Sequence, residues 1–273
     1  MSDLVFQKTP NKPWFALLFG QRKGEELPLL RAEWRGVEPW KVSEYQSICG
    51  FEKTQDLPIT YPQIMATPLH FQLLAHPAFP FPVLGLVHVS QKIEQSRPLR
   101  IDERPDLLTW CDGLTQVRRG VEFTIHTEAR IMDEVVWKAE TVTFSRSRKG
   151  HGQANRTKEP ILEDVLKTIS IDVPEHLGRT YCGISGDWNP IHVHMLLAKI
   201  FGFPRAIIHG MWSMARCVAE LPETPRKVEA HFRRPIYLPS TVVLKQGSFQ
   251  EHELVEMIRP DDGKRHLWVE AWV

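Results

Sequence analysis

The sequence predicts an α+β protein made of two similar units, each an antiparallel sheet associated with one main helix. In each half a helical region, at 61–76 and at 190–221, precedes a strand-rich stretch. A basic, polar segment at 146–160 lies between the halves. Short matches recur in the same order, since Arg97-Pro98-Leu99 is answered by Arg234-Pro235-Ile236 about half a chain later. These observations indicate an internal duplication.

The predicted boundaries follow from this order. Residues 1–60 form a loosely patterned lead-in packed on the first unit, which covers 61–145. The linker covers 146–160, and the second unit covers 161–273. The linker is basic enough to suggest nucleic-acid contact, but it lacks interleaved aromatic residues, so we favour a solvated connection.

The elements of each unit are predicted from hydrophobic periodicity and turn residues. The helix at 61–76 must hold Pro68 in its first turn or be kinked by it. Strands of the first unit are predicted at 83–89, 120–127 and 135–144, with a hairpin turn at 132–134. Strands of the second unit are predicted at about 227–236, 240–250, 252–259 and 265–273, with a turn at 261–264.

The composition is that of an ordinary globular protein. The chain has 273 residues, 42% of them hydrophobic, and 34 Lys and Arg against 33 Asp and Glu, so it lacks the basic excess of nucleic-acid binders. Its four cysteines have no metal-site spacing. The longest early apolar run, Trp14 to Phe19, is shorter than the roughly 20 residues of a membrane span and lacks signal-peptide features. We therefore expect a soluble, cytoplasmic protein with no nucleic-acid partner.

The stretch from Tyr181 to Met214 holds the residues that point to chemistry. Asn189 followed by Pro190 is typical of a helix start, and Gly202 is a plausible stop for that helix. His192 then lies in the first turn, where the helix dipole and desolvation disfavour imidazolium. A neutral histidine there can act as a base. Asp187 is close enough in sequence to share a water with it.

A second helix start is predicted at His209-Gly210-Met211. Glycine allows close approach to the backbone, and free amides at a helix N-terminus favour developing negative charge. The Gly210 N–H is therefore a candidate oxyanion donor. A carboxylate, a neutral histidine and an amide cradle are the groups needed to add water to a polarised carbonyl compound, or to remove it.

These residues also resemble a known family. Ser185 to His192 reads SGDWNPIH, followed by GFPRAIIHGM and, further on, FRRPIYLPST. This ordered set, within about Tyr181 to Val243, resembles the MaoC-like or (R)-specific enoyl-CoA hydratase (hydratase 2) family, which acts in fatty acid metabolism. The resemblance implies a double hot-dog fold, in which each antiparallel sheet wraps a central helix. The first half is similar to the degenerate hot-dog of double-hot-dog members.

The resemblance implies a role for each matching residue. Asp187 and His192 fall on the catalytic pair that activates water for addition to C3 of a trans-2-enoyl thioester. Asn189 falls on the asparagine that shapes their loop, and Gly210 on the glycine whose amide holds the thioester oxygen. The product is then a 3-hydroxyacyl thioester of (R) configuration.

The chain also departs from the family. Val218 stands where some members have a serine near the catalytic acid, which leaves fine positioning and substrate range open. The first half has no Asp-x-Asn-Pro-x-His motif. The resemblance therefore implies that it supplies a scaffold and an acyl-chain tunnel, not a second active site.

Several nearby residues are candidates for substrate binding, each with a structural alternative. Tyr181 and Ser185 either line the pocket or serve core packing and turn formation. His209 is expected to brace its turn by hydrogen bonding more than to transfer protons. Arg205, like the pair Arg233 and Arg234, either meets the phosphates of coenzyme A or belongs to a solvated face.

No metal or cofactor is predicted. His194 could share a metal with His192 only on a strand, because residues two apart on a helix point in different directions. Coenzyme A enters only as part of the substrate.

A hydro-lyase acting on an acyl-CoA or acyl-carrier-protein thioester is the leading hypothesis. An acyl-CoA thioesterase and a non-catalytic acyl-thioester-binding protein are the alternatives. Duplication supplies both halves of the usual hot-dog dimer within one chain, so a monomer with an internal pseudo-dimer or a homodimer is expected.

Overall fold

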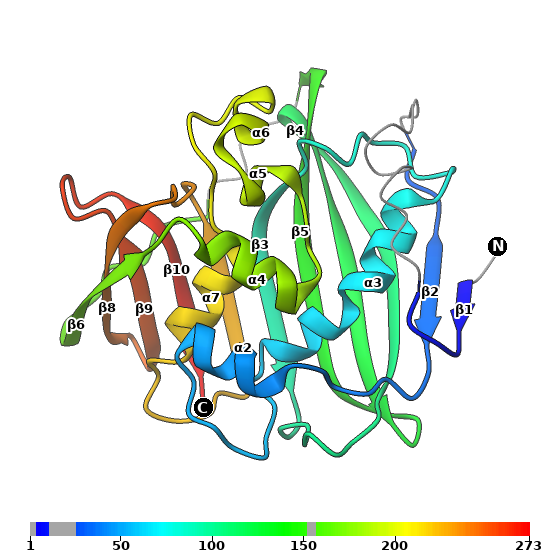
Figure 1. The fold of residues 1–273 in the computed structure, drawn as a ribbon, viewed down its shortest axis with the longest axis horizontal. Helices are drawn as coiled ribbons and strands as arrows, with labels where there is room; N and C mark the ends of the chain where they lie inside the picture. Colours follow the sequence, from blue (N-terminus) through cyan, green and yellow to red (C-terminus); the bar gives the residue numbers. More distant parts are fainter. Residues whose placement is uncertain (1–3, 11–25, 152–156) are drawn as a thin grey trace.

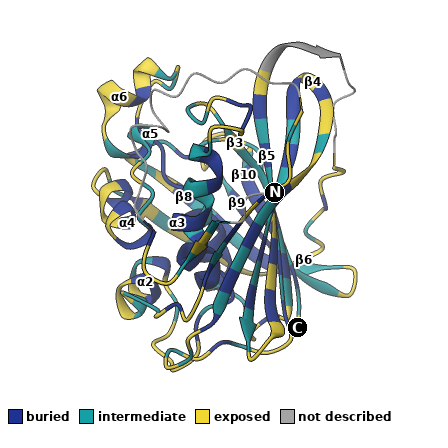
Figure 2. Ribbon diagram, turned by 90° about the vertical axis from the view of Figure 1, so that its right-hand side faces the viewer, coloured by how far each residue is buried: buried dark blue, intermediate teal, exposed yellow. Residues whose placement is uncertain are grey.

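The strands form one ten-stranded sheet, and the helices lie on one of its faces (Figures 1 and 2). The structure, a computed structural model, describes residues 4–10, 26–151 and 157–273, without the side chains of 147–151. The strand order is β1-β2-β4-β5-β3-β7-β10-β9-β8-β6, so each half of the chain contributes one contiguous half of the sheet. The architecture is the double hot-dog.

Among the described residues of the first half are the elements β1 (Leu4–Phe6), β2 (Leu30–Trp34), α2 (Val42–Cys49), α3 (Tyr61–Ala75), β3 (Val87–Gln95), β4 (Asp106–Ile131) and β5 (Glu134–His151). The described part of the second half contains β6 (Asp164–Val173), α4 (Leu177–Ser185), α5 (Pro190–Val193), α6 (Met195–Ile200), α7 (Gly210–Val218), β7 (Lys227–Phe232), β8 (Ser240–Phe249), β9 (His252–Ile258) and β10 (Arg265–Trp272).

The two half-sheets join through antiparallel pairing of β3 with β7. Ser90 lies opposite His231, and Glu94 lies opposite Lys227. Backbone hydrogen bonds therefore continue across the junction, and neither of these strands is left with an open edge. The junction gives the single chain the arrangement of two units paired side by side.

Strand β4 is folded back on itself, which explains its length of 26 residues. The Thr109 hydroxyl donates to the His126 carbonyl at 2.7 Å, and the Trp110 ring stacks on the His126 ring at 5.0 Å. The backbone turns near Arg119, whose φ is +72°. The two arms of β4 thus occupy neighbouring places in the half-sheet, between β2 and β5.

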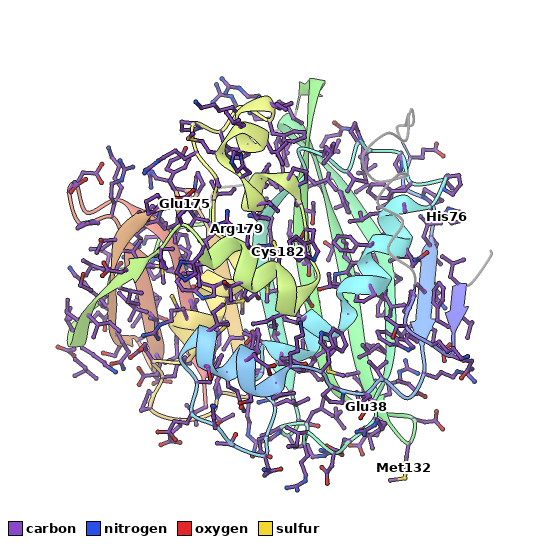
Figure 3. The ribbon with its side chains drawn as sticks, in the orientation of Figure 1. Glu38, His76, Met132, Glu175, Arg179 and Cys182 are labelled. Atoms are coloured by element: carbon purple, nitrogen blue, oxygen red, sulfur yellow. The ribbon has the colours of Figure 1, made fainter. Side chains whose placement is uncertain are left out.

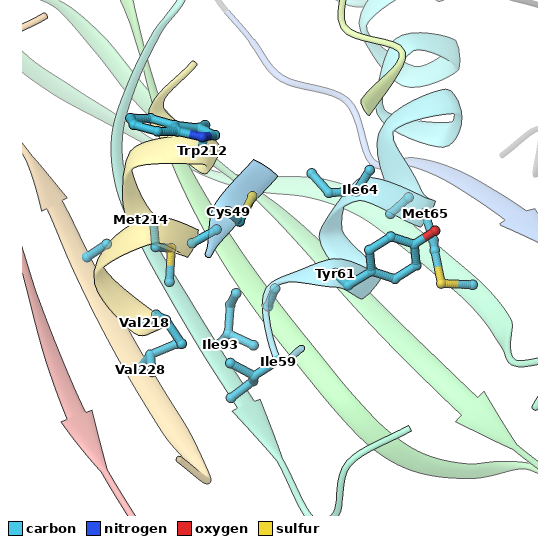
Figure 4. Close-up of a cluster of buried hydrophobic side chains, with 14 of the residues drawn as sticks. Cys49, Ile59, Tyr61, Ile64, Met65, Ile93, Trp212, Met214, Val218 and Val228 are labelled. Carbon is cyan, nitrogen blue, oxygen red and sulfur yellow. The ribbon is translucent and has the colours of Figure 1, made fainter. Parts of the chain in front are cut away.

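Helices α3 and α7 pack against the sheet and share one continuous apolar core with it. Figure 4 shows Val218 of α7 beside Val228 of β7, with Ile59 and Ile93 of the first half in the same cluster. Val218 is 4% exposed and belongs to this core. The departure from the family at this position is therefore a packing residue at the junction of the two units.

Much of the predicted secondary structure is confirmed. The first predicted helix is α3, with Pro68 inside it, and the four C-terminal strands match β7 to β10. The turn at 132–134 is also present, with Met132 and Asp133 at positive φ. The predicted strand at 83–89 begins only at Val87 and continues to Gln95.

Three predictions need correction. The helical region at 190–221 is three separate helices, because His194 has extended backbone angles that end α5 before α6 begins. The predicted linker starts too early, since β5 continues to His151. The lead-in is more ordered than predicted, because it adds β1 and β2 to the edge of the sheet and α2 to the helical layer.

In the part of the chain that the structure describes, no helix is both long and apolar enough to cross a membrane. The apolar run from Trp14 to Phe19 lies outside the described residues.

Candidate active site

The loop between α4 and α5 carries Asp187. Helix α4, which crosses the front of the molecule in Figure 3 through Arg179 and Cys182, ends at Gly186 with a φ of +76°. Beyond it the Asp187 carboxylate accepts a hydrogen bond from the Asn189 backbone N–H at 3.1 Å. This bond fixes the carboxylate against the start of α5.

Asn189 caps α5 as predicted. Its side-chain oxygen accepts from the Ile191 N–H at 3.4 Å, and Pro190 occupies the first helical position, where its missing N–H is not needed. His192 follows on the same turn and is only 8% exposed. The short cap-and-turn sequence therefore brings Asp187 and His192 into one site.

The hydrogen bonds of His192 determine which ring nitrogen is reactive. Its Nδ1 lies 2.8 Å from the carbonyl oxygen of Ile207, which can only accept. Nδ1 must therefore carry the proton, and Nε2 of the neutral ring has its lone pair available. A neutral imidazole oriented in this way is a general base.

His209 packs directly on His192. The ring centroids are 3.7 Å apart with an angle of 26° between the ring planes. His209 Nε2 donates to the backbone carbonyl of Asp187 at 3.0 Å and lies 3.9 Å from its carboxylate. His209 thus connects the two predicted catalytic residues, which agrees with the bracing role expected for it. Its buried Nδ1 has no hydrogen-bond partner among the described residues.

Burial keeps both histidines neutral. Desolvation lowers the pKa of His192, and the nearby Asp187 carboxylate only partly opposes this shift. Desolvation, together with His192 itself, lowers the pKa of His209 well below its ordinary value of 6.5. Two protonated rings stacked at this distance would also repel one another. Both rings are therefore neutral at neutral pH, and the unprotonated Nε2 of His192 is available to accept a proton.

Gly210 begins α7 immediately after His209. No side chain caps this helix, so its first amides lack partners within the helix. A Cβ at Gly210 would lie 3.2 Å from the Phe232 ring, closer than ordinary packing allows. Glycine therefore lets the backbone approach Phe232, beside the stacked histidines.

Tyr181 and Ser185 support the site from α4. The Ser185 hydroxyl donates to the Tyr181 carbonyl at 2.9 Å and accepts from the Asp187 N–H at 3.2 Å, so it shapes the Asp187 turn. Tyr181 is 1% exposed, its ring lies 4.9 Å from that of His209, and its hydroxyl has no partner among the described residues. Both residues therefore support the segment from Asp187 to His209 by packing and hydrogen bonding.

The other candidates lie in structural contacts. His194 is exposed, and its Nδ1 accepts from the Leu196 N–H at 3.1 Å, so it caps α6. Arg205 donates to the Pro239 carbonyl at 3.0 Å. Arg233 bonds to the Thr157 carbonyl, and Arg234 bonds to the Arg265 carbonyl. A contact of these arginines with coenzyme A stays a prediction.

The side chains of Asp187, His192 and His209 come within 4.8 Å of one another, as metal ligands would. Stacked rings are nevertheless unsuited to a shared ion, because an imidazole lone pair lies in its ring plane and these planes are nearly parallel. One nitrogen of each ring is also held by a backbone carbonyl. The arrangement fits proton transfer better than metal binding.

Sequence reasoning missed two contributors to the site. Ile207 supplies the carbonyl that orients His192, and only its backbone is involved, so no residue type signals it. Gly178 of α4 packs against the His192 backbone, and a Cβ there would overlap the His192 carbonyl oxygen and the Leu238 side chain. A glycine inside a helix was the available signal.

We expect Gly178→Ala to displace α4 from α5, lower the free energy of unfolding by about 1 to 3 kcal/mol and reduce activity. Gly183→Ala in the same helix is the matched control, because a Cβ at Gly183 meets nothing within 4 Å. Thermal unfolding and activity of both variants test this. Equal behaviour of the two would contradict the proposed packing role.

Protonation of buried histidines should destabilise the fold in acid. Burial lowers the pKa of His70 and His88 from 6.5 to about 4, so below 6.5 the unfolded chain binds protons that the native state excludes. Stability present above pH 6.5 is then lost as the pH falls toward 4, by about 1 to 3 kcal/mol for each histidine. Unfolding midpoints measured across this range should decrease, and less steeply in His70→Gln. A midpoint independent of pH would contradict this expectation.

The sequence is similar to those of known proteins. Residues 154–254 match the family model described as MaoC like domain. The chain is 29% identical over 227 residues to 3-hydroxyacyl-thioester dehydratase X of Mycobacterium tuberculosis, covering 81% of this chain and 77% of the relative.

Solved structures agree on the fold. The crystal structure of HtdX from Mycobacterium tuberculosis superposes with a TM-score of 0.76 at 24% identity, covering 90% of this chain and 99% of that one. A MaoC-like dehydratase from Phytophthora capsici gives 0.70 at 16% identity, covering 90% and 94%. A 12:0-ACP thioesterase from Umbellularia californica gives 0.56 at 10% identity, covering 91% and 98%. The chain therefore has the double-hot-dog fold, and its residues 154–254 are similar to the MaoC like domain.

Proposed function

We propose that the protein is a hydro-lyase that reversibly hydrates a trans-2-enoyl thioester to a 3-hydroxyacyl thioester. The observation that carries the proposal is the neutral His192, held with its Nε2 unprotonated by the Ile207 carbonyl, in one site with the Asp187 carboxylate. A dehydratase of acyl thioesters needs such a base next to a second group that can hold water.

The residues divide the reaction between them. A water held by the Asp187 carboxylate gives a proton to His192 Nε2 while its oxygen bonds to C3 of the substrate. The C2–C3 π electrons move toward the thioester, and the Gly210 N–H donates to the carbonyl oxygen as negative charge develops there. His192 then gives that proton to C2, which restores the carbonyl and returns the imidazole to its neutral form. Dehydration follows the same steps in reverse.

Two finer points rest on family resemblance. We propose the (R) configuration at C3, and a thioester of coenzyme A or acyl carrier protein as substrate. No further cofactor is needed, because the reaction exchanges only water and protons. The β3–β7 junction already pairs two hot-dog units, so we propose that a single chain contains the complete site.

A thioesterase is the rival that the fold permits, since a thioesterase is among the structural neighbours. Hydrolysis needs water delivered to the thioester carbonyl carbon, which is the atom whose oxygen Gly210 would hold. A water placed by Asp187 and His192 on the far side of C2 instead serves hydration. A non-catalytic binding protein would have no reason to keep the His192 tautomer fixed.

The proposal is tested by ultraviolet absorbance of the enoyl-thioester chromophore, with short, medium and long trans-2-enoyl-CoA substrates and a parallel assay of free thiol. We expect loss of the chromophore without release of thiol. Thiol release with an intact chromophore would favour hydrolysis, and binding without either change would favour a non-catalytic protein.

A further inference from the structure

The two half-sheets present different chemistry to the helices. In the second unit the buried positions facing the core on β7 and β10 are apolar, among them Val228, Ala230, Leu267 and Val269. In the first unit the sheet residues His88, Gln91, Thr127 and Thr141, together with Gln63 and His70 of α3, form a polar inner cluster. A sheet packed on a helix needs no polar groups, and burying them costs free energy unless they are hydrogen-bonded.

Three members of the cluster, Gln91, Thr141 and Gln63, are joined in one series of hydrogen bonds. Gln91 Oε1 accepts from the Thr141 hydroxyl at 2.8 Å. The Thr141 oxygen accepts in turn from Gln63 Nε2 at 3.0 Å. A separate contact within the cluster places His70 Nε2 at 2.8 Å from the Thr127 hydroxyl.

This series of hydrogen bonds ends at a side-chain oxygen that has no donor. Gln63 is 4% exposed, and its Oε1 has no hydrogen-bond partner among the described residues. A buried carbonyl oxygen without a donor is costly, typically about 1 to 3 kcal/mol. A group that completes the cluster must therefore donate a hydrogen bond.

The cluster is continuous with the candidate active site. Phe232 lies against Gly210, and its ring centroid is 4.6 Å from that of His88. From His88 the strand continues three residues to Gln91, a length of about 10 Å. His70 and His88 are half-buried, whereas the other four members of the cluster are buried. An acyl chain extending from the thioester past Phe232 would reach it.

The charge state of the cluster restricts its ligand further. Burial lowers the pKa of His70 and His88 to about 4, so both rings are neutral at physiological pH. The cluster contains no cation that could pair with a carboxylate. A neutral hydroxyl group satisfies these conditions, since it donates one hydrogen bond and accepts others.

We infer that the substrate is a trans-2-enoyl thioester whose acyl chain carries a hydroxyl group, which donates to Gln63 Oε1 in the polar inner cluster. This inference rests on the proposed function for the reaction at C3, and it adds the chemical class of the acyl chain. An acyl-chain tunnel for an unsubstituted chain would not require the cluster.

The test compares two medium-chain trans-2-enoyl-CoA substrates of equal length, one with a hydroxyl at the far end of the chain and one without. We expect the wild-type kcat/KM to favour the hydroxylated substrate by about tenfold, the value of one well-made hydrogen bond. Gln63→Leu removes the acceptor and should abolish this preference while hydration continues. A substrate ending in a carboxylate should be disfavoured by both proteins.

Gln246→Leu is the matched control, because Gln246 is a buried glutamine of the second unit that bonds to Glu253. It should keep the wild-type preference. If Gln63→Leu does not fold, Thr141→Val is the second variant. It removes the hydroxyl that joins Gln63 to Gln91, changes the shape of the side chain little, and should weaken the preference for the hydroxylated substrate.

Failure of the inference and failure of the proposed function are distinguishable. Hydration of both substrates with equal kcat/KM would overturn the inference and leave the function standing. If neither substrate is hydrated, the proposed function is wrong. Calorimetric measurement of the binding of the two saturated acyl-CoA analogues, one with the hydroxyl and one without, then tests the inference by itself. Tighter binding of the hydroxylated analogue, by about tenfold, would support it; equal affinity would overturn it.

Discussion

Asp187→Asn should lower kcat for enoyl-thioester hydration by about a thousandfold. The amide keeps the size of the carboxylate and can still accept from the Asn189 N–H, so the turn before α5 is preserved. It loses the negative charge that holds water and that favours a proton on His192, an effect seen in the opposing influence of Asp187 on the His192 pKa. The measurement is kcat from chromophore loss at saturating substrate.

Asp172→Asn provides the control for this change. Asp172 lies on β6 and bonds to the Thr241 hydroxyl at 3.0 Å, in an exposed position. It should retain wild-type activity. Full activity of Asp187→Asn, with unchanged unfolding temperature in both variants, would contradict the assignment of Asp187.

His192→Ala should lower kcat by a similar factor, about a thousandfold, because it removes the proton acceptor. The effect on stability should be smaller, since the lost hydrogen bond to the Ile207 carbonyl contributes about 1 kcal/mol. His209 does not replace it, because its Nε2 proton is held by the Asp187 carbonyl. Rate and unfolding temperature together separate the catalytic loss from a folding defect.

His194→Ala is the matched control in the same segment. His194 caps α6 from an exposed position, so its loss should cost about 1 kcal/mol of stability and little activity. Equal loss of activity in the two histidine variants would show that the segment, and not the His192 base, determines the rate.

The local parts of the site were predictable because they depend on adjacent residues. Asn189, Pro190 and the helix turn place His192 near Asp187 within a few residues, and capping rules describe such geometry. The stacking of His209 on His192 was not predictable, because α6 and the segment that follows it separate the two residues in the sequence. Hydrophobic periodicity predicts elements along the sequence but not which of them lie in contact.

The fold likewise has elements that adjacent residues predict and elements that depend on distant contacts. Strands β7 to β10 were predicted closely, whereas the separation of α5 from α6 depends on the extended backbone of a single residue, His194. The two arms of β4 and the edge strands of the lead-in depend on pairing with distant partners. Val218 was expected to bear on the site, and only its place in the core between the units shows its packing role.

The most direct test of the central claim uses water labelled with heavy oxygen. Wild-type protein is incubated with a trans-2-enoyl-CoA in labelled water, and the products are analysed by mass spectrometry. Hydration by Asp187 and His192 predicts an intact thioester with the label in its 3-hydroxyl group. Label in a free carboxylate, accompanied by free coenzyme A, would contradict the account and identify a thioesterase.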